Sequence, residues 1–154
     1  MIKIKIYGTR SDRRLKKLLS AAATHYLQEL LPRVRKIRIK IQCIPNLMEK
    51  ENVYGDCGQC GSEEPNFDYI IRIDNCDSYH LMLTTLAHEF IHIKQYVRRE
   101  LSFYVHNQLA VRWKKICCSD YDYDLAPWEI EANSRELELY LNFFNCSALL
   151  DSYK

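Results

Sequence analysis

The stretch LTTLAHEFIHIKQY, residues 83–96, carries the strongest indication of fold and chemistry in the chain. Three ionisable side chains, His88, Glu89 and His92, lie there among leucine, isoleucine, alanine and phenylalanine. Burying such groups is costly unless a metal pairs with them or a water-filled cleft keeps them wet. His88 and His92 are four residues apart, so on a helix they share one face and can direct imidazole nitrogens at one ion.

This H-E-x-x-H spacing is typical of zinc sites, because zinc accepts neutral imidazole readily. Glu89 follows the first histidine and can approach a metal-bound water without displacing a ligand, which suits a general base. A catalytic zinc usually takes three protein ligands, so the third has to come from elsewhere. Glu129 and Glu131, in APWEIEANSRE, are two residues apart and diverge by about 200°, so only one of them can face the ion.

The remaining segments read as alternating strands and helices in one α+β domain, residues 1–154, a length that suits a single core. We expect strands over residues 2–7, 35–43 and 67–74, and a long loop over residues 45–66. The first helix is expected to run from a cap at Ser11 or Asp12 to about residue 31, and the second over residues 79–99 from a cap at Asp77 or Ser78. The last helix is expected from Pro127 to about residue 150. Residues 101–118 are ambiguous, and our interpretation of LAVRWKKICC (109–118) is a strand or hairpin rather than a helix.

Composition excludes few partners but indicates a compartment. The formal net charge is only +2, which argues for no particular binding partner. The N-terminus lacks an apolar block of signal-peptide length, and no charge-free apolar run is long enough to span a bilayer. We therefore expect a cytoplasmic protein with no membrane partner, in which the seven cysteines are free thiols or metal ligands.

The pair HEFIH (88–92) and EIEAN (129–133) resembles the zinc sites of the gluzincin metallopeptidases, and the order of elements is similar to minigluzincin and SprT-like proteins. The resemblance implies a small zincin-like domain, with a short mixed sheet packed on the active-site helix and a C-terminal helix that carries the third ligand. It also implies zinc metalloendopeptidase activity on a peptide or protein substrate, with Glu89 transferring the proton.

Within that resemblance Glu129 falls on the third zinc ligand, and Asn133 on the residue that hydrogen-bonds a zinc-binding histidine. Asn133 departs from the usual aspartate and would polarise the imidazole less. The alternative ligand is Glu131, with Arg135 or Glu136 downstream.

Two further parts of a peptidase are expected from these residues. A donor is needed for the oxyanion of the tetrahedral intermediate, and Tyr123 is our candidate. The alternatives are Tyr121, Tyr104 and His106. In related peptidases an edge strand next to the active-site helix pairs with extended substrate, and residues 67–74 are expected to play this part.

The segment YGDCGQCGS places Cys57 and Cys60 at the C-x-x-C spacing of half a zinc knuckle, so a second, structural metal is one interpretation. A redox or disulfide pair, plain loop cysteines, and a thiol that reaches the catalytic zinc as an inhibitory ligand are the others.

Basic residues concentrate in RSDRRLKK (10–17) and RVRKIRIK (33–40). Such a face can contact a phosphate backbone, so DNA is a candidate partner, as for SprT-like proteases. The small net charge favours a solvated face balanced by acids elsewhere. A DNA-binding module would lose its affinity on charge reversal at Arg38 and Lys40, whereas a zinc-stabilised binding protein would hold the metal without turnover.

Overall fold

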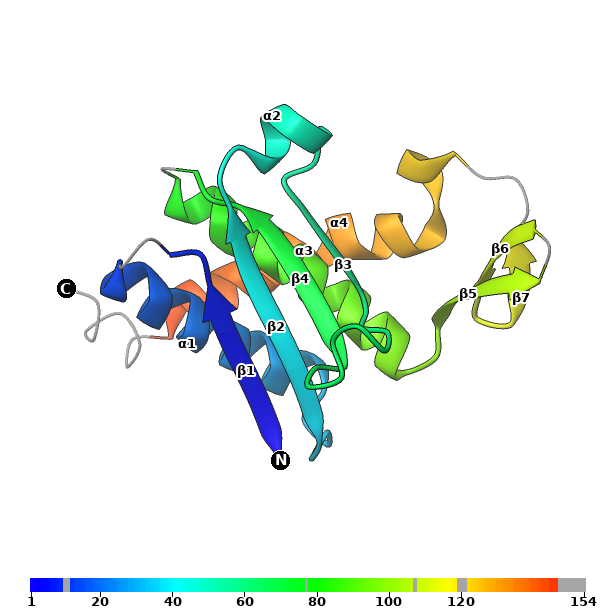
Figure 1. Cartoon of the computed structure of the whole chain (residues 1–154), viewed down its shortest axis with the longest axis horizontal. Helices are drawn as coiled ribbons and strands as arrows, with labels where there is room; N and C mark the ends of the chain where they lie inside the picture. Colours follow the sequence, from blue (N-terminus) through cyan, green and yellow to red (C-terminus); the bar gives the residue numbers. More distant parts are fainter. Residues whose placement is uncertain (10–11, 77, 107, 119–121, 147–154) are drawn as a thin grey trace.

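The computed structural model describes residues 1–9, 12–76, 78–106, 108–118 and 122–146. They form an α+β fold with a four-stranded and a three-stranded sheet (Figure 1). In chain order the elements are β1 (Ile2–Tyr7), α1 (Arg13–Leu30), β2 (Ile37–Ile44), α2 (Leu47–Glu51), β3 (Gly55–Gln59), β4 (Tyr69–Asp74), α3 (Tyr79–Val97), β5 (Leu101–His106), β6 (Gln108–Trp113), β7 (Ile116–Cys118), the 3₁₀ turn η1 (Tyr123–Leu125) and α4 (Pro127–Asn145).

The larger sheet has the strand order β1-β2-β4-β3. Strands β1, β2 and β4 run parallel, whereas β3 pairs antiparallel with β4, so the predicted mixed sheet is confirmed. The expectation that residues 67–74 form the substrate-pairing edge is wrong, because β4 is hydrogen-bonded on both sides. The edge nearest α3 is β3, and β1 is the edge on the opposite side.

Helices α1 and α3 cover one face of this sheet, and α4 packs on α3 (Figure 1). Strand β2 shows how the sequence imposes this layering: its residues alternate between buried and half-buried positions, with Ile37, Ile39 and Ile41 against the helices. Helix α3 is buried on several sides, including its polar residues Lys94 and Gln95. A helix enclosed in this way places any ligand-binding side chain at fixed depth.

Helix boundaries follow from capping groups that the sequence contains. Asp12 accepts a hydrogen bond from the Leu15 N–H (2.9 Å) and starts α1. Ser78 does the same for α3 through the Leu81 N–H (3.2 Å). Within the described residues, no helix is both long and apolar enough to cross a bilayer.

The main departure from the predicted elements is the loop over residues 45–66, which contains α2 and β3. The β3 sequence, GDCGQ, is poor in strand-forming residues, and its extended form comes from pairing with β4. The expectation of strands in residues 101–118 is confirmed by the small antiparallel sheet β5-β6-β7. Helix α4 ends at Asn145, and residues 147–150 of the predicted helix lie outside the described residues.

Candidate metal centre

Two imidazoles of α3 face each other across one helical turn. The Nε2 atoms of His88 and His92 are 3.0 Å apart, and the rings meet edge to face. His92 is 6% exposed, so the pair lies at the bottom of a pocket and not on a solvated surface. The helical spacing read from the sequence therefore brings both nitrogens to one point.

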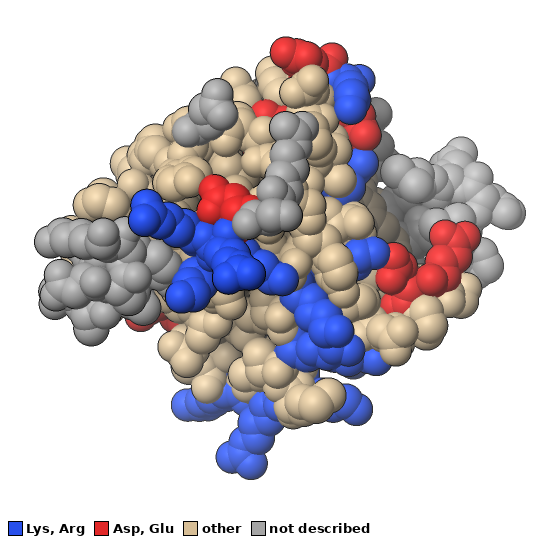
Figure 2. Space-filling model, turned by 60° about the vertical axis from the view of Figure 1, so that its left-hand side comes forward, with Lys and Arg blue, Asp and Glu red and all other residues tan. Residues whose placement is uncertain are grey.

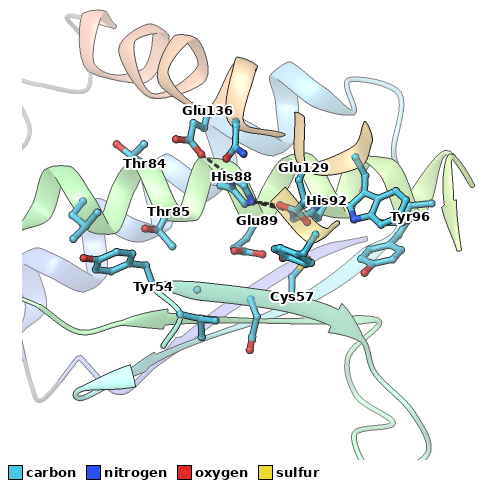
Figure 3. Close-up of a pocket in the computed structure, with 18 of the residues that line it drawn as sticks. Tyr54, Cys57, Thr84, Thr85, His88, Glu89, His92, Tyr96, Glu129 and Glu136 are labelled. Carbon is cyan, nitrogen blue, oxygen red and sulfur yellow. Dashed lines mark hydrogen bonds and ion pairs between the residues drawn. The ribbon is translucent and has the colours of Figure 1, made fainter. Parts of the chain in front are cut away.

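The third group comes from the first turn of α4, where Pro127 occupies the first helical position. The Glu129 carboxylate lies 3.3 Å from each Nε2 atom, with Oε2 near His88 and Oε1 near His92. Among the described residues, His88, His92 and Glu129 form the one cluster of potential metal ligands (Figure 3). The choice of Glu129 over Glu131 agrees with this geometry.

The outer nitrogen of each imidazole has its own acceptor. His88 Nδ1 lies 2.7 Å from Oε2 of Glu136, and His92 Nδ1 lies 2.8 Å from Oε1 of Gln95. Glu136 thus takes the position expected for Asn133, which lines the pocket but is exposed. Glu136 is two helical turns beyond Glu129 on the same face of α4, and its longer side chain reaches the ring.

The contacts of the two Nδ1 atoms prepare the inner nitrogens of the site to bind a metal ion. An acceptor at each Nδ1 favours the tautomer with its proton there, which leaves the Nε2 lone pair directed inward. Two such lone pairs and a carboxylate then converge, an arrangement that requires a positive charge at its centre. Ligands about 2.0–2.1 Å from a tetrahedral ion lie about 3.3 Å apart, close to the observed spacings. The residues therefore fit a metal ion.

A buried network fixes the orientation of Gln95. Its amide nitrogen donates to the Trp128 carbonyl (3.0 Å) and to Oε2 of Glu131 (2.8 Å), so its oxygen faces His92. Glu131 also accepts from the buried Lys94 at 2.6 Å. The alternative ligand Glu131 thus points away from the imidazoles. The spacing of Gln95 three residues after His92 is the signal by which sequence analysis would find it.

The pKa values show that the cluster attracts positive charge. Burial lowers the pKa of His88, but its contacts with Glu129 and Glu136 outweigh this and raise the pKa to about 10. Burial raises the pKa of Glu129, but hydrogen bonds from both imidazoles prevail and lower it to about 2. Without a metal, the site therefore holds a proton on His88 between two carboxylates.

Glu89 points from α3 towards β3 (Figure 3). Burial raises the pKa of Glu89 to about 7, although the adjacent imidazoles oppose the change. A carboxyl with this pKa can both accept and release a proton near neutral pH. The strand approaches closely here, since a Cβ on Gly55 would lie 2.5 Å from Thr85 Cγ2 and 3.1 Å from Glu89 Oε1.

The cluster opens into a pocket of about 490 Å³ between β3, α3 and α4. Tyr123 in η1 lines this pocket and is 63% exposed. Partial burial and the Glu129 carboxylate, with which its hydroxyl hydrogen-bonds, raise the pKa of Tyr123 above its usual value. Tyr121 lies outside the described residues, as do the side chains of Tyr104 and His106.

The cysteines of the C-x-x-C segment diverge. Cys57 lines the pocket, and its thiol hydrogen-bonds to Glu89, while burial and that carboxylate raise its pKa well above the usual value. Cys60 lies near Lys40 and Glu64 on the other side of the sheet. Among the described residues neither cysteine belongs to a cluster of three or more potential metal ligands, and the second, structural metal stays a prediction. Both thiols are free.

The basic strand β2 is largely neutralised. Arg38 forms a salt bridge with Asp68 (2.6 Å), and Lys40 pairs with Glu64. These contacts favour the solvated-face interpretation for this strand, because a cation already paired with a carboxylate releases less free energy on meeting a phosphate.

No family model, curated protein or solved structure matches the chain.

We expect the metal-free protein to lose stability as pH rises from 6.5 to about 10, because His88 is charged in the folded state over this range and neutral in the unfolded state. Below pH 6.5 this contribution is fully present. Urea unfolding of chelator-treated protein at several pH values measures it. His88→Gln should flatten the curve, and an unchanged slope in that variant would contradict the assignment.

Glu136→Gln should weaken zinc binding by about 10-fold or more, since the carboxylate orients His88 and raises its basicity. Competition with a chromogenic chelator measures the affinity. Glu138→Gln, an exposed carboxylate on the same helix, is the matched control and should bind zinc as the wild type does. If Asn133→Ala weakened zinc binding more than Glu136→Gln does, Asn133 and not Glu136 would be the residue that orients His88.

Proposed function

We propose that the protein is a zinc-dependent metallopeptidase of the gluzincin type. One observation carries the proposal: the imidazoles of His88 and His92 and the Glu129 carboxylate converge at 3.0–3.3 Å, with the buried Glu89 beside them in an open pocket. Two histidines and a glutamate are a donor set that suits catalytic zinc and leaves a position for water. Zinc is thus the metal we infer.

The arrangement of elements also supports a zincin-like domain. A mixed sheet precedes and packs on the helix that carries the two histidines, and a later helix supplies the glutamate. This is the architecture that the gluzincin resemblance implies. Fold likeness alone does not establish chemistry, so the weight rests on the site residues.

A zinc ion held by this cluster would polarise a substrate carbonyl and lower the pKa of a bound water. Glu89 would be the group that accepts a proton from that water and passes it to the leaving amine. Its pKa of about 7 fits both transfers near neutral pH. The hydroxyl of Tyr123, already directed at Glu129, is the donor we propose for the oxyanion.

Strand β3 is the element we propose for substrate binding. It is the sheet edge beside α3, and its residues Gly55 and Cys57 line the pocket. An extended peptide laid along this edge would pair through main-chain groups, a mode that tolerates many sequences. The close approach at Gly55 keeps the strand next to Glu89.

The alternative is a zinc-stabilised binding protein without turnover, and the depth of Glu89, which is 4% exposed, favours it. The two functions differ in a measurement: the alternative predicts one zinc per chain but no cleavage of unfolded proteins or peptides. A SprT-like protease associated with DNA is a further alternative, which the pairing of Arg38 and Lys40 with carboxylates weakens.

Glu89→Gln should keep the zinc and lose peptide hydrolysis by at least about 100-fold, because the amide cannot accept the proton. Metal analysis and cleavage of an unfolded protein substrate measure the two effects. Glu63→Gln, a surface carboxylate, is the control and should be fully active. Equal hydrolysis by Glu89→Gln and the wild type would rule out the mechanism.

Gly55→Ala should lower hydrolysis with little change in zinc affinity, since the new methyl would strike Thr85 and crowd Glu89 without touching the ligands. We expect a loss of about 10-fold or more in turnover, as small displacements at a reacting centre are costly. Gly58→Ala, whose added carbon has open space around it, is the matched control. Equal activity of the two variants would show that the close approach is irrelevant.

A further inference from the structure

The sheet edge remote from the metal centre is open. Among the strands of the described residues, β1 is terminal in the sheet and pairs with β2 alone. Ile37 donates its N–H to the Met1 carbonyl, so the odd-numbered residues of β1 bond to β2. The main-chain groups of Ile4 and Ile6 therefore point to the outer edge, where no described strand lies. Open N–H and C=O groups of this kind are a template for a further strand.

The helix beside this edge has positively charged side chains at its N-terminus, where negative ones are favoured. Helix α1 begins with Arg13, Arg14, Lys16 and Lys17, and its first turn contains no acidic residue. The N-terminus of a helix already carries partial positive charge, so cations there are destabilising and repel one another. The carboxylate of the N-cap, Asp12, offsets part of this charge. Arg13 and Lys16 line a groove beside this edge, and an anionic ligand there would offset their charge.

A groove of about 630 Å³ joins the two features. Its cationic lining consists of Lys5 from β1 and Arg13, Lys16 and Lys17 from α1, and none of the described residues that line it is acidic. Ile4 and the exposed Tyr7 add apolar and aromatic surface. Figure 2 shows Lys and Arg side chains gathered on this face of the molecule.

We propose that this groove binds an acidic, extended segment of a partner protein, which adds as a strand to β1. Its main chain pairs with Ile4 and Ile6, and its carboxylates meet Arg13 and Lys16 of α1. The site is separate from the metal centre, which lies between β3, α3 and α4. The proposal therefore does not depend on hydrolysis there.

Two other roles for this groove, protection of the edge strand against aggregation and binding of a nucleic acid, each explain fewer of its features. Lysines on an edge strand protect against aggregation, which explains Lys5 but not the cations of α1. A nucleic acid would use the same charges, yet it offers no main-chain partner for the open edge. The neighbouring Arg38 and Lys40, which would extend a nucleic-acid track across the sheet, are engaged with carboxylates.

The test uses the full chain with Glu89→Gln, which prevents cleavage of the probe. The probe is a fluorescent peptide of about eight residues that alternates glutamate and valine, a typical strand length, followed by anisotropy. The comparison peptides replace glutamate by glutamine or valine by proline, and a single-stranded oligonucleotide of equal charge is the fourth ligand. Proline removes the N–H donor at every second residue, disfavours an added strand and leaves the charge, so it separates strand addition from simple attraction.

Arg13→Glu/Lys16→Glu should weaken binding of the acidic peptide by at least about 10-fold. Arg33→Glu/Arg35→Glu makes the same change of charge at exposed positions outside the groove and should change the affinity by less than about twofold. Amide exchange at Ile4 and Ile6 should slow when the peptide binds. Equal weakening in both double variants, tight binding of the proline peptide, or preference for the oligonucleotide would each overturn the proposal.

Discussion

The packing of α4 against α3 is the constraint on which the site depends. Glu129 and Glu131 diverge from the first turns of α4, and each reaches a different part of α3. Glu131 holds the buried Lys94 and Gln95, while Glu129 reaches the two imidazoles. Because an unpaired charge at the depth of Lys94 would be very costly, the pair fixes the rotation and height of α4. The position of Glu129 at the cluster follows from that fixed rotation.

The charges around the cluster explain why a cation belongs there. Glu129 and Glu136 both contact His88, and Glu89 lies beside it. This excess of carboxylate over imidazole raises the affinity for a proton or a metal, as the opposite pKa shifts of His88 and Glu129 indicate. A divalent ion would neutralise more of this charge than one proton does. Burial, against the effect of the two imidazoles, gives Glu89 a pKa near neutrality.

The two edges of the larger sheet differ in chemistry, which suits two different tasks. Strand β3 is rich in glycine and approaches α3 closely, so it can present main-chain groups beside the cluster. Strand β1 borders a cationic groove on the opposite edge. In our proposals β3 aligns the bond to be cut and β1 holds an acidic partner. A small peptidase gains selectivity when a second site has to be engaged.

The sequence by itself determined what depends on local spacing. The i, i+4 pair His88 and His92 and the alternation in β2 are properties of single elements, and each is seen in the structure. The sequence also narrowed each of two helix caps to two adjacent residues, of which Asp12 and Ser78 accept the capping hydrogen bonds. The sequence also excluded Glu129 and Glu131 as simultaneous ligands of one ion, since helical geometry directs their side chains apart. Tertiary structure alone decided the contact of Glu136 with His88, the divergence of Cys57 from Cys60, and the place of β3 at the edge. These features depend on how elements distant in the chain are rotated against one another, and no local pattern encodes that rotation.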